Sequence, residues 1–156
     1  MENVIIHICE VLAAEKSLYE ILLTLAREKQ EQILGNRVEE LLETIKQEKE
    51  TLQQIEIEEE KRADLLQGFA EGETSFGQIC ERADAATTDR LKLIREELLS
   101  TLEELTEIND VNKRLLQDVL HLNRQIFKSL SNESAGYGYH PEKAGEPSNM
   151  IMDKRA

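Results

Sequence analysis

The fold is decided by the stretch from residue 89 to residue 130, which reads DRLKLIREELLSTLEELTEINDVNKRLLQDVLHLNRQIFKSL. Apolar residues recur in it every seven positions, in two rows that begin at Leu91 and at Ile94 and keep one register to the end of the stretch. At 1.5 Å per residue such a helix is roughly 60 Å long. A helix of this length needs neighbours to pack against. We therefore expect an all-α fold with a long C-terminal coiled-coil-like helix.

Two amphipathic patterns come before this stretch and supply those neighbours. Residues 3–34 carry a broad apolar stripe of helical period. Residues 37–68 carry a weaker stripe, which Glu48 and Arg62 interrupt. Since only a short break separates the two patterns, we expect an extended antiparallel helical hairpin or bundle.

The break consists of Gly35 and Asn36. Glycine adopts the left-handed conformation without a steric penalty, so we expect Gly35 to end the first helix. Asn36 with Glu39 has the spacing of a capping box, so we expect Asn36 to begin the second helix.

The connection to the long helix contains a second, glycine-rich break at residues 68–77. A short helix over 78–86 follows it, and Ser75 is its expected cap, because Gln78 stands at the capping-box spacing. We expect the long helix itself over 89–130.

The chain divides into a helical domain over residues 1–131 and a tail over 132–156. The tail lacks apolar periodicity and is rich in Gly, Ser and Pro. Such a composition cannot bury a core of its own, so we expect a flexible or disordered segment.

The charge balance excludes some classes of partner. Lysine and arginine number 19, aspartate and glutamate 32, and the net charge is −13. A nucleic-acid binder needs a basic face, and an anionic membrane surface repels an acidic protein. No apolar run approaches the roughly 18 residues of a membrane span, and the N-terminus lacks the features of a signal peptide. We expect a cytoplasmic protein that neither binds nucleic acid nor inserts into membranes.

The sequence offers no catalytic, cofactor or metal site. It holds none of the nucleophile, zinc-protease or phosphate-binding motifs. Cys9 and Cys80 stand in no metal-binding spacing, so we expect free buried thiols. Asp118 and His121 have the spacing of half a di-metal site in a four-helix protein, but no second such pair exists. We therefore expect no enzyme, although a four-helix metal protein is the alternative that this pair raises.

The last part of the long helix is apolar on more than one side. One row suffices for packing, and Leu116, Phe127 and Leu130 remain as a second face for a helical partner. The alternative is that a bundle covers both rows. Asn112 also has two interpretations: a core amide that fixes the register, or a group that binds the backbone of a bound segment.

Three stretches resemble the FlgN-type flagellar export chaperones. They are EKQEQILGNRVEELLETIKQEKETL at 28–52, IEEEKRADLL at 57–66, and LTEINDVNKRLLQDVLHLNRQIFKSL at 105–130. The third resembles the C-terminal helix of that family with its paired asparagines, here Asn109 and Asn112. A glycine-flanked tyrosine, Tyr137, follows in the position of the family's tail tyrosine. The likeness covers about residues 10–138, and the order of its elements is more telling than any single stretch.

This resemblance implies an all-helical cytoplasmic chaperone of the hook–filament junction proteins FlgK and FlgL. It would bind their C-terminal segments, prevent premature assembly and aid delivery to the type III export gate. In the family the C-terminal helix is implicated in client binding. Carried over to this sequence, the client-binding residues are Ile108, Asn109, Asn112, Leu115, Leu116, Val119, Leu122, Ile126, Phe127 and Leu130.

The tail tyrosine of the family is implicated in docking to the export-gate protein FlhA. Tyr137 is the corresponding residue here, and Tyr139, two positions on, is the other candidate. Two further interpretations of the whole chain stay open at this point. One is a structural coiled-coil homodimer, and the other is a chaperone for a different flagellar client, such as flagellin or the cap protein.

Overall fold

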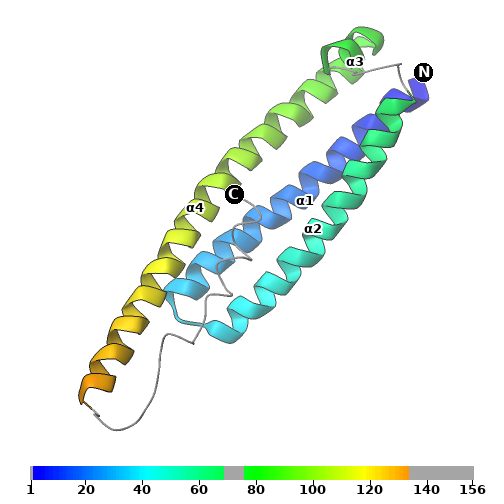
Figure 1. Cartoon of the computed structure of the whole chain (residues 1–156). Helices are drawn as coiled ribbons and strands as arrows, with labels where there is room; N and C mark the ends of the chain where they lie inside the picture. Colours follow the sequence, from blue (N-terminus) through cyan, green and yellow to red (C-terminus); the bar gives the residue numbers. More distant parts are fainter. Residues whose placement is uncertain (1, 69–75, 134–156) are drawn as a thin grey trace.

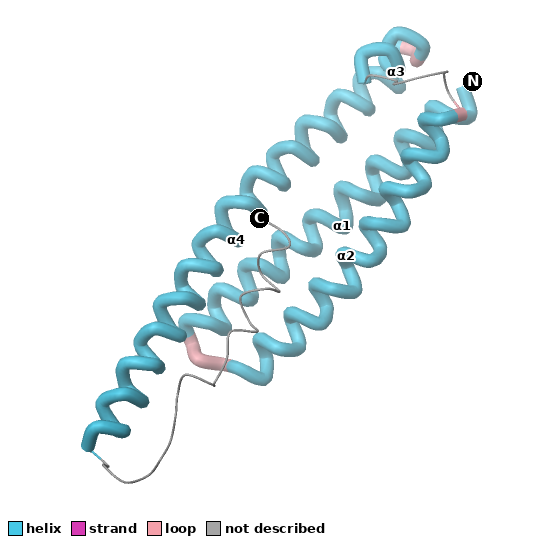
Figure 2. The backbone as a smooth tube through the Cα atoms, viewed as in Figure 1, coloured by secondary structure: helices cyan, strands magenta, loops and turns pink. Residues whose placement is uncertain are grey.

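The computed structural model describes residues 2–68 and 76–133 and contains only helices and short turns in these ranges (Figures 1 and 2). The helices are α1 (Glu2–Leu34), α2 (Val38–Gln67), α3 (Phe76–Arg82) and α4 (Ala85–Glu133). The predicted all-α class with its long C-terminal helix is confirmed. Of the predicted tail over 132–156, residues 132 and 133 belong to α4, and the rest lies outside the described residues.

The turn between α1 and α2 forms differently from the prediction. Asn36, and not Gly35, has the left-handed backbone, with φ of 54°. The Arg37 N–H donates to the Gln32 carbonyl at 2.9 Å and the Asn36 N–H to the Ile33 carbonyl at 3.2 Å, which is the Schellman pattern with Asn36 just past the helix end. Asparagine tolerates this conformation better than most residues. Because Asn36 ends α1, it does not cap α2: Arg37 holds the cap position, without a side-chain cap hydrogen bond.

The junction between α3 and α4 also lies earlier than predicted. α3 ends at Arg82, and the expected cap Ser75 lies outside the described residues. The Asp84 carboxylate accepts a hydrogen bond from the Thr87 N–H at 2.7 Å, which makes Asp84 the N-cap of α4. Hydrogen bonds with the Thr87 side chain and with its N–H lower the pKa of Asp84. The long helix therefore begins at Ala85 and takes in residues that the periodicity assigned to the short helix or the linker.

Helix α1 lies between α2 and α4 and packs along both (Figure 1). It runs antiparallel to α2 and parallel to α4. One apolar cluster lies where α3 closes the N-terminal end of the bundle, and a second lies midway along the three long helices. The buried members of the two clusters are Ile5, Cys9, Ile79 and Leu91, and Leu22, Leu23, Ala26, Ile55 and Leu105.

Ion pairs explain why the apolar stripe of α2 is weak. Glu48 lies 2.5 Å from the Nζ of Lys29, and Arg62 lies 2.6 Å from the carboxylate of Glu15. The lysine and both glutamates are buried, so these pairs belong to the α1–α2 contact. The two residues that interrupt the stripe in the sequence are therefore the partners of buried charges on α1.

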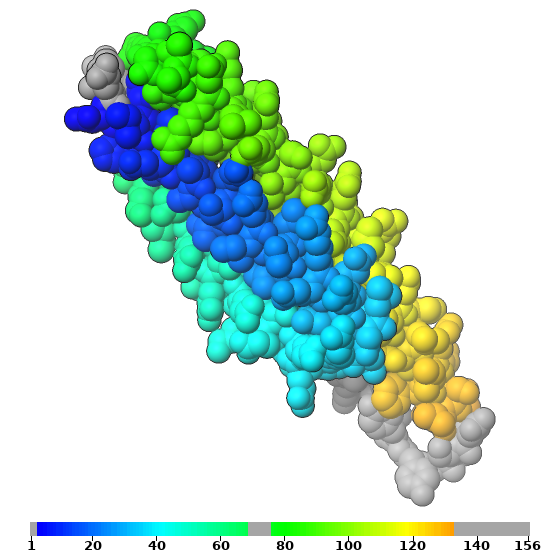
Figure 3. Space-filling model, turned by 180° about the vertical axis from the view of Figure 1, so that it is seen from behind, coloured from blue at the N-terminus to red at the C-terminus, as the bar shows by residue number. Residues whose placement is uncertain are grey.

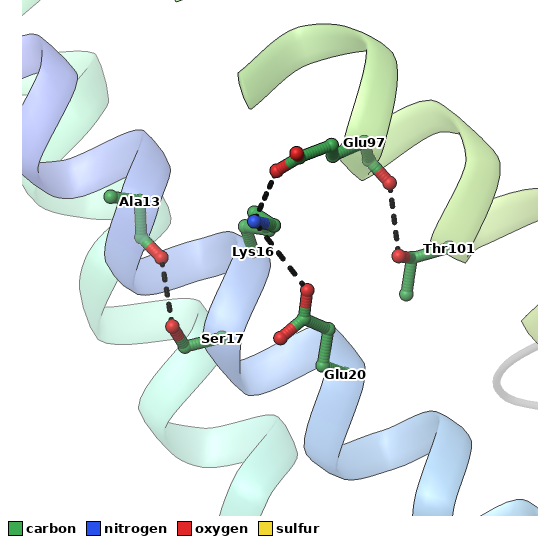
Figure 4. Close-up of polar contacts among 6 residues, drawn as sticks. All are labelled: Ala13, Lys16, Ser17, Glu20, Glu97 and Thr101. Carbon is green, nitrogen blue, oxygen red and sulfur yellow. Dashed lines mark hydrogen bonds and ion pairs between the residues drawn. The ribbon is translucent and has the colours of Figure 1, made fainter. Parts of the chain in front are cut away.

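The contact between α1 and α4 combines apolar packing with charge. Lys16 of α1 pairs with Glu97 of α4 and, at 3.6 Å, with Glu20 of its own helix (Figure 4). The hydrogen bond to Glu97 raises the pKa of Lys16. Arg27 pairs with Glu104 at 3.0 Å further along the same seam. The two pairs occur in the same order along both helices, which agrees with the parallel arrangement of α1 and α4.

Candidate functional site

The candidate site lies where α4 runs past the end of its neighbour. The Asn112 side chain of α4 lies level with Ala26 of α1, because its Nδ2 donates to the Ala26 carbonyl at 2.8 Å. α1 ends eight residues beyond Ala26, at Leu34. Since the two helices are parallel, α4 has no α1 beside it beyond about residue 120. Every residue from 121 to 130 is exposed, and Figure 3 shows this end of α4 projecting beyond α1 and α2. We call residues 121–132 the overhang.

The N-terminal third of the predicted client-binding residues is used in packing. Asn112 is completely buried and bonds to the backbone of α1, as expected of a core amide. Its Oδ1 atom is buried without a hydrogen-bond partner. Ile108 packs against the middle apolar cluster, and Asn109 is half-buried. Of the two interpretations of Asn112, the structure matches the core amide.

The other predicted residues become steadily more exposed along α4. Leu115, Leu116 and Val119 are half-buried. The last four large apolar side chains are about half exposed: Leu122 55%, Ile126 49%, Phe127 47% and Leu130 53%. The bundle therefore buries the apolar rows of α4 in their first part only. Tyr137 and Tyr139 lie outside the described residues.

The overhang also differs from the rest of the protein in charge. Residues 119–132 contain no aspartate or glutamate, and this is the longest such run in the chain. Arg124 and Lys128 are exposed there, one helical turn apart, and neither makes an ion pair within the described residues. A net charge averaged over the chain hides this segment, whereas a search for acid-free runs would have found it.

The other polar candidates do not gather into a site. Among the described residues no group of three or more His, Cys, Asp or Glu is placed to hold a metal ion. His121 is exposed, and its Nε2 lies 3.1 Å from Nε2 of Gln125. Cys9 is buried, and burial raises the pKa of its thiol. No helix in the described ranges is long and apolar enough to cross a membrane.

Comparison with known proteins identifies the family. The FlgN protein family matches residues 1–145. The chain belongs to the FlgN family. It is a flagellar export chaperone for FlgK and FlgL, and it is not an enzyme.

One curated relative has a sequence of similar length. The chain is 26% identical over 139 residues to the uncharacterized protein YvyG of Bacillus subtilis (strain 168), a match that covers 86% of each chain. No solved structure matches the chain. The family match confirms the resemblance drawn from the three stretches.

Proposed function

We propose that this FlgN-family chaperone binds the C-terminal segments of FlgK and FlgL on the apolar face of α4, with the overhang as the main contact. The observation that carries this proposal is the exposure of four large apolar side chains on one short helical segment. They are spaced so that they share one broad face of the helix. An amphipathic client helix that lies on this face would bury its own apolar stripe, which is the stripe that drives premature assembly.

The proposed contact residues differ in how far they are exposed. Leu122, Ile126, Phe127 and Leu130 are exposed enough for direct contact, and Leu115, Leu116 and Val119 extend the face toward the bundle. Ile108, Asn109 and Asn112 lie at the inner end, where Ile108 and Asn112 hold α4 on α1. Binding in the cytoplasm and handover at the export gate belong to the same proposal. A client segment that orders on binding gives a moderate affinity, which suits release at the gate.

Calorimetric titration of the full-length chain with FlgK and FlgL C-terminal peptides tests the proposal. The test variant carries Leu122→Asp and Ile126→Asp. Burying half of each side chain contributes about 1–1.5 kcal/mol, so the double variant should bind roughly a hundredfold more weakly. The matched control carries Leu42→Asp and Ile57→Asp, two α2 residues with 61% and 52% exposure. It should bind like wild type.

The same titration separates the competing interpretations. Equal binding by the overhang variant and wild type would refute the proposed site. A flagellin C-terminal peptide should not bind. A concentration-independent dimer that the overhang variant converts to monomer, with no peptide binding, would favour the homodimer.

We propose further that the tail docks to FlhA through Tyr137, with Tyr139 as the second candidate. The family resemblance supports this assignment. Pull-down with the soluble part of FlhA should lose the complex for Tyr137→Ala and keep it for Tyr139→Ala. The reverse result would move the assignment to Tyr139, and retention by the double variant would refute tyrosine docking.

A further inference from the structure

Asn123 is the one polar side chain on the apolar side of the overhang, and it is exposed. It follows Asn112 by eleven positions, which turns the side chain by only about 20° around α4. All other residues from 115 to 130 that point within about 80° of Asn112 are apolar. They are Leu115, Leu116, Val119, Leu120, Leu122, Ile126, Phe127 and Leu130. Asn123 therefore points in nearly the same direction as an amide that faces α1.

The contact of Asn112 shows what an amide in this position on α4 can bind. Its Nδ2 donates to the main-chain carbonyl of Ala26 at 2.8 Å, and both residues are completely buried. The distance between two packed helices depends on the side chains at their contact, so the small side chain of Ala26 lets α1 come close enough for this bond. The α1–α4 contact thus pairs an asparagine on α4 with a small residue on the facing helix.

The apolar side of the overhang continues this contact beyond the end of α1. α1 ends at Leu34, level with about residue 120 of α4. A helix seated on the overhang in line with α1 would cover Asn123 as α1 covers Asn112. An amide that loses water without gaining a partner destabilises the complex. The apolar stripe of a client helix offers no polar side chain, but each of its main-chain carbonyls has a second lone pair that can accept.

From this geometry we propose that Asn123 donates a hydrogen bond to a main-chain carbonyl of the client helix. The occupant is an amphipathic helix with alanine, glycine or serine at the position of its apolar stripe that faces Asn123. This inference rests on the proposed function of the overhang and names the feature of the client that the overhang recognises. The apolar residues around Asn123 supply most of the binding energy, whereas the amide fixes the register of the client and selects against helices that leave it unpaired.

Two designed peptides test the inference on the full-length chain. Both form an uncharged amphipathic helix with a leucine stripe, and they differ at one central stripe position, which holds alanine in the first peptide and leucine in the second. The added leucine keeps the carbonyl away from Asn123 but packs against the apolar side chain of the variant Asn123→Leu. In fluorescence anisotropy the affinity ratio, alanine peptide over leucine peptide, should be about tenfold higher for wild type than for Asn123→Leu.

Two further variants separate hydrogen bonding from a change in apolar area. Asn123→Asp keeps the size of the side chain but removes the donor, so it should bind the alanine peptide about tenfold more weakly than wild type. The matched control is Gln125→Leu, which replaces an exposed amide by leucine about 140° around α4 from Asn112. It should keep the wild-type ratio. The same ratio for wild type and Asn123→Leu, or an equal change in Gln125→Leu, would overturn the inference.

The FlgK and FlgL peptides distinguish this inference from the function on which it rests. If Leu122→Asp with Ile126→Asp abolishes their binding while Asn123→Leu and Asn123→Asp leave it unchanged, the binding site stands and recognition by the amide is wrong. If they do not bind wild type while the designed peptides show the expected ratio, the proposed function fails and recognition by the amide stands. A dimer in analytical ultracentrifugation that neither designed peptide disrupts would place a second copy on this face and overturn the inference.

Discussion

Removal of the charge on Glu48 tests whether the α1–α2 contact depends on its buried ion pair. Glu48 lies 2.5 Å from Lys29, and the two side chains are 10% and 2% exposed. The substitution Glu48→Gln keeps the shape of the side chain and leaves the Lys29 ammonium buried without its counter-charge. The second variant carries two substitutions, Lys29→Met and Glu48→Leu. It removes both charges and replaces both charged side chains by apolar ones of similar length.

The two changes should have very different effects on the free energy of unfolding. Leaving one buried charge unpaired costs about 3–5 kcal/mol, whereas replacing a whole buried pair by packed apolar groups is often neutral or stabilising. For a domain of this size a loss of about 3 kcal/mol lowers Tm by ~10 °C. We therefore expect Glu48→Gln to be the less stable variant, although it is the more conservative change.

Urea denaturation followed by circular dichroism measures both free energies. Glu43→Gln on the same helix is the control, because Glu43 is exposed. It should change the free energy of unfolding by less than about 0.5 kcal/mol. The reasoning is refuted if Glu48→Gln is no less stable than this control, or if the double variant loses more than Glu48→Gln does.

Three further predictions concern the remaining polar features of the bundle. Burial raises the pKa of Glu15 above its ordinary value of 4.5, in spite of the nearby Arg62, so the folded state binds this proton more tightly than the unfolded chain. The contribution of Glu15 to stability therefore falls as pH rises from about 4.5 through the folded pKa. In urea titrations, the free energy of unfolding of Glu15→Gln should therefore increase relative to that of wild type between acidic and neutral pH. A difference between the two free energies that does not change with pH would contradict the direction of the pKa shift. Burial also raises the pKa of the Cys9 thiol. A disulfide reagent should therefore modify the half-buried Cys80 first and Cys9 only as fast as the protein unfolds. Mass spectrometry of partly modified protein measures this order, and modification of Cys9 before Cys80 would contradict the prediction. Asn36→Ala places alanine, which tolerates the left-handed region less well than asparagine, at φ of 54°. Thermal unfolding should show the folded state destabilised by about 1 kcal/mol. An unchanged stability would mean that the turn relaxes to another conformation.

The helices were predictable because their apolar residues repeat with helical period over long stretches. The two breaks were also predictable, but their details were not. The sequence offered Gly35 and Asn36 side by side, and glycine is the commoner left-handed residue, so propensity favoured Gly35. The observed hydrogen bonds instead place the helix end one residue later. The apolar periodicity predicted a long helix from residue 89, whereas the hydrogen bond that Asp84 accepts from the Thr87 N–H caps a helix that begins at Ala85.

The extent of the candidate site was harder to predict than the helix that carries it. The heptad rows continue unchanged from the buried Leu91 to the exposed Ile126, so periodicity alone gives no sign of where burial ends. Asn112 illustrates the difficulty: an amide in an apolar row suits either a core contact or a bound segment. The neighbour decides between them, because Ala26 of α1 lies close enough to accept its hydrogen bond.

The length of α1 therefore determines where the apolar face of α4 becomes a surface. The Schellman turn at Asn36 ends α1 at the level of about residue 120 of α4. The apolar rows of α4 therefore belong to the core before residue 120 and are exposed after it. If the overhang binds the client, as proposed, then binding and stability depend on different parts of one continuous helix. The buried pairs at Lys29 and Arg62 and the two apolar clusters hold the bundle together without any contribution from the overhang. A chaperone with this arrangement can expose apolar side chains to its client at one end, while its acidic bundle keeps it in solution.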